Sequence, residues 1–414
     1  MGFSYDKLWR LTGELGISKT QLRDNCSFSS STLSKLSKNE NVSMDILERI
    51  CIYLDCSIGD IVEVLPQAIK PKPTNSLKFI DLFAGIGGFR LAGETNGMEC
   101  VFSSEIDKQA CEVYKQNFGD MPNGDITEIP AGEIPNFDIL FAGFPCQPFS
   151  YAGQLQGFED ETRGTLFFDI LRILKEKQPQ AFLLENVKGL KSHARGNTMR
   201  TVLHHLEELE YTVHWTILNS LNFGVPQSRE RWYCVGFKNE ADFSFPEELN
   251  TKPILREIID ESQNDNPTLR LSDFELERIK HHFSISPAEL SNQLRVRHDN
   301  SKYEPHTKKG KYGIYSFLKS DKTLRFHVGD YAKTQIQEAY YCHQDSYTPS
   351  IIAARAPKLW DLERHLSDRE CARLQGFPES FALSSSPAQT RKQMGNAVTV
   401  PVVTRIAEEI LLAV

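Results

Sequence analysis

Short apolar runs alternate with amphipathic segments between residues 77 and 238. The runs predict strands, and the segments with apolar residues at three- and four-residue spacing predict helices. Strands are expected at 77–83, 98–105, 137–143, 179–187, 212–220 and 231–237, and helices at 90–97, 107–119, 166–178 and 197–209. This alternation predicts an α/β fold with a mostly parallel, doubly wound sheet, whose last two strands lie at one edge. Such sheets bind ligands beyond the carboxyl ends of their strands.

Breaks in composition divide the rest of the chain. The stretch 65–76 contains three prolines and no apolar periodicity, which is typical of a linker. Strand-like sequence ends after residue 238, and helical patterning returns near residue 364. We therefore expect a helical domain at 1–66, a linker at 67–76, the α/β domain at 77–238, a smaller variable domain at 239–363, and a return to the α/β domain at 364–414.

Composition excludes several classes of protein. The 414 residues are 40% hydrophobic and 25% charged, which is typical of a soluble globular chain with several domains. The sequence contains neither an apolar run long enough to span a membrane nor a signal core, so secretion is not expected. Nine scattered cysteines without a C-x-x-C pair predict reduced thiols in a cytoplasm and no metal site.

The charge distribution hides a basic stretch. The net charge is −8, and residues 240–290 hold twelve acidic and five basic residues. Residues 291–333 instead hold ten basic and four acidic residues. This stretch is basic enough to contact a phosphate backbone, although a solvated charged face would have the same composition.

A glycine-rich turn follows the first strand, in the sequence FIDLFAGIGGFRLAG. Gly85, Gly87 and Gly88 allow a sharp turn and a close approach to a ligand. Arg90 stands where a dinucleotide fingerprint has its third glycine, which leaves room for a different nucleoside cofactor. Glu105 ends the second strand, where a carboxylate can bind ribose hydroxyls. The alternative is an ordinary strand-to-helix turn.

Two reactive side chains follow later strands. Cys146 lies in Pro-Cys-Gln-Pro at the end of the third of these strands, a stiff turn that presents a thiol as a nucleophile. Glu185 follows four apolar residues at the end of the next strand, where partial burial would raise its pKa. The alternatives are a core cysteine and a helix-capping or salt-bridged glutamate. Arg229 and Arg231 alternate on what we expect to be an edge strand, so both can face a carbonyl oxygen or a phosphate, although paired surface arginines are common.

Five motifs in this order, DLFAGIGGFR, FPCQPFS, ENV, QSRER and QMGNAVTVPV, resemble the DNA cytosine-5 methyltransferase family over nearly all of residues 77–414. The resemblance implies a Rossmann-like fold, S-adenosylmethionine as cofactor, double-stranded DNA as partner, and methyl transfer to carbon 5 of a flipped-out cytosine. It also implies a target-recognition domain at 239–363, with its basic half in the major groove, and an enzyme of a restriction-modification system that is competent as a monomer. The chain is then expected in a prokaryotic cytoplasm.

The resemblance implies roles for individual residues. Cys146 would be the nucleophile, and Glu185, Arg229 and Arg231 would hold the cytosine. The cofactor would be bound by Phe83, Gly85, Gly87, Gly88, Glu105, Ile106, Asp125, Ile126, Pro145, Leu166 and Asn396. A mobile loop at 150–164 would close over DNA, and DNA contacts are expected from Gln147, Ser150, Arg163 and Asn186. Asn186 could also hold the loop at the strand end beside Glu185 through backbone hydrogen bonds.

The chemistry explains why a thiol and a carboxyl group are needed together. Carbon 5 of cytosine is a poor nucleophile, and a thiolate adding to carbon 6 pushes electron density onto it. A carboxyl group that hydrogen-bonds or protonates ring nitrogen 3 stabilises the charge that develops there. Stacking hides carbon 6 in a duplex, so the base must leave the helix.

The first seventy residues resemble a phage-repressor-like helix-turn-helix. Ser18 and Gln21 form a capping-box pattern. Leu33 and Leu36 are expected to face inward, and Ile46, Ile50 and Leu54 form an apolar stripe. Ser30, Ser31 and Lys35 are the expected contacts to operator DNA, through which this domain would regulate transcription. A bundle that contacts protein is the alternative.

Three rival functions fit parts of the sequence. A nicotinamide oxidoreductase explains the glycine turn and Glu105 but not Cys146 with Glu185. A transcription factor with an inactive enzyme-like body predicts damaged motifs, whereas these are intact. An RNA cytosine methyltransferase shares the chemistry, but the repressor-like domain and the large variable block favour DNA.

Overall fold

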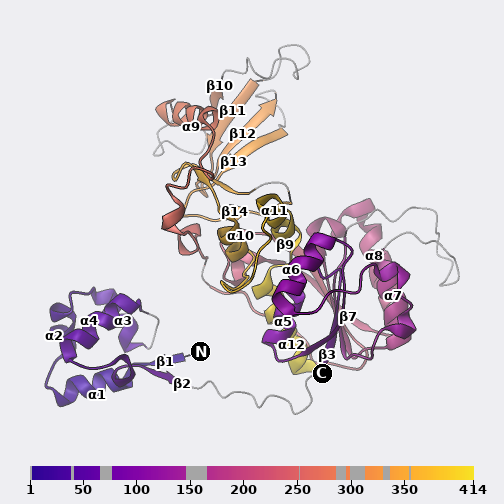
Figure 1. Cartoon of the computed structure of the whole chain (residues 1–414), viewed down its shortest axis with the longest axis horizontal. Coiled ribbons are helices and arrows are strands. Elements are labelled where there is room, and N and C mark those ends of the chain that lie inside the picture. Colours follow the sequence, from indigo (N-terminus) through magenta and orange to yellow (C-terminus); the bar gives the residue numbers. More distant parts are fainter. Residues whose placement is uncertain are drawn as a thin grey trace. The chain divides into compact units, whose positions relative to one another are not determined.

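The computed structural model describes residues 2–38, 42–65, 77–145, 166–250, 252–285, 295–298, 313–329, 336–353 and 356–414 (Figure 1). The chain forms two compact units, Met1–Asn75 and Ser76–Val414. Within the described ranges, no helix has the length and apolar character needed to cross a bilayer.

The N-terminal unit is a small helical bundle with a two-stranded antiparallel ribbon. Its elements are β1 (Gly2–Ser4), α1 (Asp6–Glu14), α2 (Lys19–Asn25), α3 (Ser30–Ser37), α4 (Met44–Leu54), a 3-10 turn (Ile58–Asp60) and β2 (Glu63–Leu65). The predicted capping box is confirmed, because Ser18 Oγ accepts from the Gln21 N–H and Gln21 Oε1 accepts from the Ser18 N–H. The expected apolar stripe of α4 is buried in the core, together with Leu36.

A six-stranded sheet organises the larger unit. Its order is β4-β3-β5-β6-β9-β7. The strands are β3 (Lys78–Leu82), β4 (Glu99–Ser104), β5 (Ile139–Gly143), β6 (Ala181–Val187), β7 (Thr212–Asn219) and β9 (Glu230–Phe237). The first four run parallel to one another, and β9 pairs antiparallel with both β6 and β7. The predicted α/β class with a mostly parallel sheet is confirmed.

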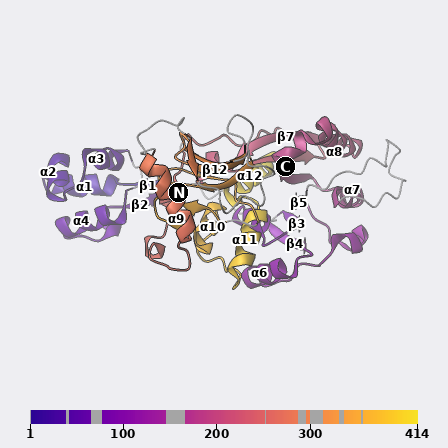
Figure 2. The same ribbon diagram turned by 90° about the horizontal axis from the view of Figure 1, so that it is seen from above.

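Helices cover both faces of this sheet (Figures 1 and 2). On one face, α7 (Leu166–Lys177) and α8 (Asn197–Glu208) pack on apolar side chains of β5 and β6. On the other, α5 (Gly88–Thr95) and α12 (Val400–Ala413) bury the alternate side chains of the same strands. Because both faces are buried, the central strands are almost continuously apolar. The polar residues that can take part in chemistry lie at or just beyond the carboxyl ends of these strands.

The position of β9 corrects one expectation. Arg231 lies on β9, which is flanked by β6 and β7 and is therefore an interior strand, while β7 forms the edge. Arg229 precedes β9 and follows the short strand β8 (Gln227–Ser228), which pairs with β14 (Thr348–Pro349). The prediction that these arginines lie on an edge strand was wrong. The strand β7 comes before β9 in the sequence, but it pairs with the outer side of β9 and so forms the edge of the sheet.

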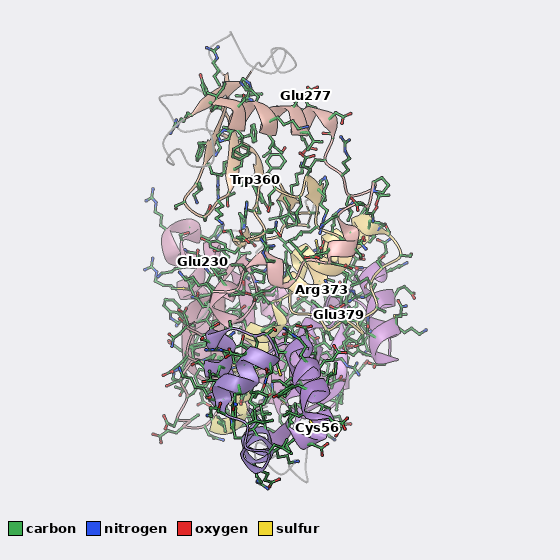
Figure 3. The ribbon with its side chains drawn as sticks, turned by 90° about the vertical axis from the view of Figure 1, so that its left-hand side faces the viewer. Cys56, Glu230, Glu277, Trp360, Arg373 and Glu379 are labelled. Atoms are coloured by element: carbon green, nitrogen blue, oxygen red, sulfur yellow. The ribbon has the colours of Figure 1, made fainter. Side chains whose placement is uncertain are left out.

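The variable block forms a second, antiparallel sheet in the order β10-β11-β12-β13. The strands are β10 (Val296–His298), β11 (Gly313–Leu318), β12 (Leu324–Gly329) and β13 (Ile336–Tyr341). Helix α9 (Asp273–Ile285) contributes Leu276 and Ile279 to the apolar cluster under this sheet. Trp360 lies below α9 in Figure 3, and its ring centroid is 4.6 Å from that of Phe283.

The C-terminal part returns to the α/β sheet. It contains β15 (Lys358–Leu359), β16 (Arg364–His365), α10 (Asp368–Leu374), α11 (Pro387–Asn396) and α12. Arg373 and Glu379 join the end of α10 to the next loop through an ion pair of 2.7 Å (Figure 3). Short 3-10 helices connect the elements of the whole larger unit. They lie at Ile126–Glu128, Ala131–Glu133, Lys188–Lys191, His193–Gly196, Ser220–Phe223, Leu255–Glu257 and Glu261–Gln263.

Candidate active site

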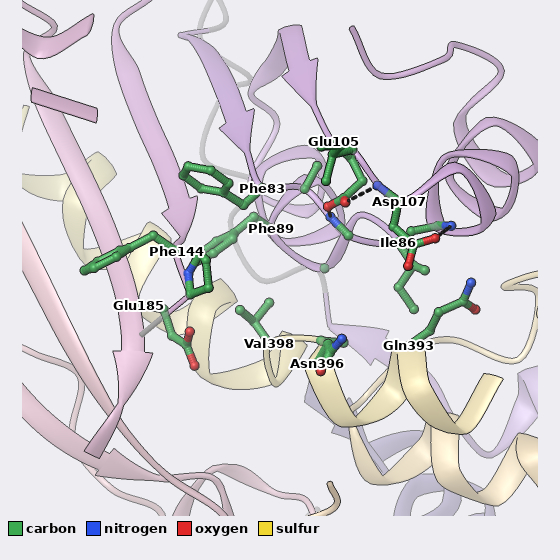
Figure 4. A pocket seen from close by; sticks show the side chains of 18 of the residues that line it. Phe83, Ile86, Phe89, Glu105, Asp107, Phe144, Glu185, Gln393, Asn396 and Val398 are labelled. Carbon is green, nitrogen blue, oxygen red and sulfur yellow. Dashed lines mark hydrogen bonds between the residues drawn. The ribbon is translucent and has the colours of Figure 1, made fainter. Parts of the chain in front are cut away.

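A cavity of about 490 Å³ lies beyond the carboxyl ends of β3, β4, β5 and β6. Its volume is in the range of small-molecule sites. Glu105 and Glu185 lie at opposite sides of it, and Asn396 and Val398 lie between them along one wall (Figure 4). Of the residues expected to bind a cofactor, ten line this cavity: Phe83, Gly85, Gly88, Glu105, Ile106, Asp125, Ile126, Pro145, Leu166 and Asn396. The eleventh, Gly87, is the N-cap residue of α5 beside it.

The loop after β3 has an unusual backbone. Phe83 has a φ of 57°, in the left-handed region that non-glycine residues seldom occupy. Gly87 has a φ of 94°, and a Cβ there would lie 2.2 Å from the ring of Phe118. The glycine is therefore required for both conformation and space. This turn points the loop's backbone and the Phe83 side chain at the cavity.

Glu105 is held by two main-chain donors. The Gly85 N–H donates to its Oε2 and the Asp107 N–H to its Oε1, both at 2.8 Å. These bonds fix the orientation of the carboxylate plane at the end of β4. The glycine loop and the next strand end are thus tied together at the Glu105 side of the cavity.

The neighbouring wall combines a polar turn with exposed apolar surface. Asp125 Oδ1 accepts hydrogen bonds from the Thr127 N–H and hydroxyl, which holds Asp125 at the start of a 3-10 turn. Ile106 lines the cavity although it is 69% exposed. An apolar side chain left open at a cavity mouth suits a ligand with a flat apolar ring.

Glu185 forms the other end of the cavity. It lies near the carboxyl end of β6 with only 9% exposure, and its Oε1 lies 3.1 Å from Arg231 Nε. Burial raises the pKa of Glu185 above 4.5, and the charges of Arg231 and then Arg229 oppose this rise. The sequence predicted burial and a raised pKa. A carboxyl group that holds its proton closer to neutrality can donate a hydrogen bond to a ring nitrogen.

Arg229 does not face the cavity as freely as its spacing from Arg231 suggested. Its Nη1 donates to Ser350 Oγ and the Ile351 carbonyl, and its Nη2 donates to the Gly395 and Ala397 carbonyls, at 2.9–3.2 Å. It is 3% exposed, and burial lowers its pKa to about 10. Arg229 lines the cavity, but its guanidinium binds the protein main chain, so the geometry favours a positioning role over direct contact with a base.

Asn186 holds the main chain two residues before the expected nucleophile. Its Nδ2 donates to the Phe144 carbonyl at 2.9 Å, and the side chain is almost fully buried. Burial favours the loop-holding role of Asn186 over direct contact with DNA. Pro145, the next residue, lines the cavity. Cys146, Gln147, Ser150 and Arg163 lie outside the described residues.

The expected operator contacts lie on α3 of the N-terminal unit. Ser30, Ser31 and Lys35 are all exposed, whereas Leu36 is buried. Ser29 caps the helix by accepting from the Thr32 N–H. This helix thus presents a small polar surface on a buried apolar base.

Sequence reasoning missed several residues of the site. The cavity is also lined by Phe89, Phe144, Gln393 and Val398. Asp107 and Lys392 line it too, and they form an ion pair of 2.6 Å with each other. Val398 stands in the C-terminal motif, two residues after Asn396, so the motif itself was a usable signal. The pairing of Asp107 with Lys392 left no signal in the sequence, because 285 positions separate the two residues.

Comparisons with known proteins agree with this arrangement. A model of the C-5 cytosine-specific DNA methylase family matches residues 77–412, and a model of the Cro/C1-type HTH DNA-binding domain matches residues 7–67. Type II methyltransferase M1.ScrFI of Lactococcus lactis subsp. cremoris is 43% identical over 84% of this chain and 81% of its own. Type II methyltransferase M.HhaI of Haemophilus parahaemolyticus is 40% identical over 83% of this chain and 96% of its own.

Solved structures share the fold. The S. pombe Dnmt2 methyltransferase has a TM-score of 0.56 at 19% identity, covering 82% of this chain and 98% of that chain. The rival oxidoreductase interpretation is excluded by the family match. With its motifs intact and an N-terminal Cro/C1-type HTH domain, the chain belongs to the C-5 cytosine-specific DNA methylases and is a DNA (cytosine-5-)-methyltransferase of a family that uses S-adenosylmethionine.

Proposed function

We propose that this enzyme methylates a cytosine flipped out of a specific duplex sequence, through a covalent bond between Cys146 and carbon 6. The observation that carries this proposal is the cavity with two chemically different ends. One end has a clamped carboxylate, Glu105, and the other has a buried carboxyl group beside an arginine, Glu185 with Arg231. A nucleoside cofactor and a pyrimidine base need these two environments.

S-adenosylmethionine fits the Glu105 end. The oriented carboxylate suits two ribose hydroxyls, and Phe83 and Ile106 offer apolar surface to a purine. Asp125 lies on the same wall for an exocyclic amine, and Asn396 lies on the wall that leads toward Glu185. The cofactor supplies a methyl group on a positively charged sulfur. The protein's part is to bind and orient the cofactor at the Glu105 end of the cavity.

The Glu185 end fits cytosine. Protonated Glu185 would donate to ring nitrogen 3, and Arg231 would hold the carboxyl group and the base's carbonyl oxygen in place. Asn186 anchors Phe144, so the following Pro-Cys turn starts from a fixed point. From there the thiolate of Cys146 would attack carbon 6. Carbon 5, made nucleophilic in this way, would take the methyl group that the cofactor supplies, leaving S-adenosylhomocysteine. Loss of the carbon-5 proton and release of Cys146 would then restore the aromatic ring.

DNA contacts are the finer part of this proposal. Gln147, Ser150 and Arg163 would contact the strand around the extruded base, and the block at 239–363 would read the sequence in the major groove. We further propose that the enzyme works as a monomer and protects DNA in a restriction-modification system. The names of the relatives, Type II methyltransferases, support the last point.

Transfer of a radiolabelled methyl group tests the substrate class. Duplex DNA should accept label from S-adenosylmethionine, and RNA of matched composition should accept less than about a hundredth as much, because the proposed recognition needs B-form grooves. Bisulfite sequencing of DNA from expressing cells should then show one methylated motif. Equal labelling of RNA would contradict the proposal.

We also propose that the N-terminal domain binds an operator near its own promoter and regulates transcription. The supporting observation is helix α3, which exposes Ser30, Ser31 and Lys35 above a buried core. These small polar side chains and one cation suit a helix in a major groove.

Footprinting of the full chain on its upstream DNA tests this role. Lys35→Glu should weaken operator protection by about tenfold or more, because a phosphate contact becomes a repulsion. Arg10→Glu on α1 makes the same change of charge away from α3 and should keep most of the protection. If wild-type protein protects no upstream site, the regulatory role fails.

A further inference from the structure

A buried polar cluster lies behind the wall of the cavity that carries Asn396 and Val398. It consists of Gln227, Arg229, Gln375 and Thr399, and we refer to these four residues as the brace. Each is at most 3% exposed. A buried amide or guanidinium is costly unless it is hydrogen-bonded, so the partners of these side chains show what the cluster holds.

Gln375 is the centre of the brace. Its Nε2 donates to the Met394 carbonyl at 2.6 Å and to the Ala397 carbonyl at 3.2 Å. Its Oε1 accepts from Gln227 Nε2 at 3.2 Å and from the Thr399 hydroxyl at 2.9 Å. The whole amide is therefore used, and its donors hold the chain on both sides of Asn396.

Gln227 links this centre to the end of the variable block. Its Nε2 also donates to the Leu374 carbonyl, and its Oε1 accepts from the Ile351 N–H at 2.8 Å. Arg229 makes the same connection by a second route, because it binds the carbonyls of Ile351, Gly395 and Ala397. The same two segments are thus bridged twice.

The two segments also touch directly. A Cβ on Gly395 would lie 2.3 Å from the Ala353 nitrogen and 2.5 Å from the Ile352 carbonyl carbon, so the backbones meet where no side chain fits. Apolar packing is non-directional, whereas the brace's hydrogen bonds specify one register of residues 394–399 against 351–353. A small displacement of this wall would leave several buried groups unpaired.

We propose that Gln227, Gln375 and Thr399 are positioning residues for the cofactor: through the brace they hold the Asn396 wall in the geometry that binds S-adenosylmethionine. This inference rests on the proposed cofactor site. None of the three side chains lines the cavity, and they act through the main chain on both sides of Asn396. The expected signature is weaker cofactor binding with little change in the chemical step.

Thr399→Val is the sharpest test, because it removes one hydroxyl donor and keeps the branched shape. The dissociation constant for S-adenosylhomocysteine, measured by calorimetry without DNA, should rise by about three- to tenfold, as for the loss of one buried hydrogen bond. The KM for S-adenosylmethionine should rise equally, with kcat changed by less than about twofold.

Two further variants separate positioning from packing. Thr399→Ser keeps the hydroxyl and should restore binding to within about twofold of wild type. Thr404→Val makes the same chemical change inside α12, the helix that Thr399 precedes, where the Thr404 hydroxyl donates to the Val400 carbonyl of its own helix. This control should leave the dissociation constant unchanged. Gln227→Leu should weaken binding at least as much as Thr399→Val, because it removes the other donor to Gln375 Oε1 and two further hydrogen bonds, to Leu374 and Ile351.

Two results would overturn the proposal. One is a lower melting temperature for Thr399→Val with an unchanged dissociation constant, which would make the brace purely structural. The other is a Thr399→Ser protein as weak as Thr399→Val. Wild-type binding and DNA methylation are measured first, so failure of the proposed function would appear in wild type, and failure of the brace only between variants.

Discussion

Cys146→Ala is expected to abolish methyl transfer to DNA, lowering the rate by about a thousandfold or more. Without sulfur at carbon 6, no enamine forms, and carbon 5 keeps its poor nucleophilicity. The chain just before this residue is held in place, because Asn186 binds the Phe144 carbonyl and Pro145 lines the cavity. Binding of S-adenosylhomocysteine should persist, because the residues proposed to bind it do not include this sulfur.

Trapping with modified DNA makes the test specific for the covalent bond. Duplex DNA with 5-fluorocytosine at the target should form an adduct with wild-type protein that survives denaturant, since fluorine cannot leave as the proton does. Cys146→Ala should form none. Cys56→Ala, a half-buried cysteine of the N-terminal unit, serves as the matched control and should trap normally. Methyl transfer by Cys146→Ala at near wild-type rate would disprove the assigned nucleophile.

Glu185→Gln should lower kcat by about a hundredfold or more, within the range attributed to a positioned general acid. The amide keeps the shape and can still donate a hydrogen bond to ring nitrogen 3, but it cannot transfer a proton. The burial that raises the pKa of Glu185 is the physical basis of this expectation. Single-turnover methyl transfer at saturating cofactor would measure it.

The shape of the pH profile adds a signature that does not depend on the absolute rate at any one pH. Deprotonation of Glu185 removes the proton donor, so the wild-type rate should fall as pH rises through the high-pH limb. Glu185→Gln has no proton to lose there and should lack this fall. Glu207→Gln, on the exposed face of α8, should behave as wild type. A Glu185→Gln enzyme with an unchanged rate and profile would leave Arg231 as the principal stabilising group.

The two ends of the cavity explain how one fold serves two ligands. Glu105 follows the end of β4, where two N–H groups fix its carboxylate, whereas Glu185 lies near the end of β6, where burial raises its pKa. The same residue type is thereby set to bind hydroxyls at one end and to hold a proton at the other. The local environment decides this, because each carboxyl group responds to its own donors and burial.

The sequence by itself determined the elements of the α/β unit and the charged residues at the two ends of the cavity. Apolar periodicity reflects burial on one or both faces, so it located the strands and helices of the α/β unit and the apolar stripe of α4. Residues at the carboxyl ends of parallel strands meet at one edge of the sheet, so Phe83, Glu105 and Glu185 could be placed together without coordinates.

Only the tertiary structure decided what the long-range polar side chains do. Arg229 and Arg231 have the same local signal, yet one binds the main chain at Gly395 and Ala397 while the other pairs with Glu185. Gln227 meets Gln375 across 148 positions of sequence. A periodic pattern records which face of an element is buried, but a hydrogen bond needs two particular atoms at one distance and angle. That coincidence arises only once the strands, the variable block and the C-terminal helices have packed.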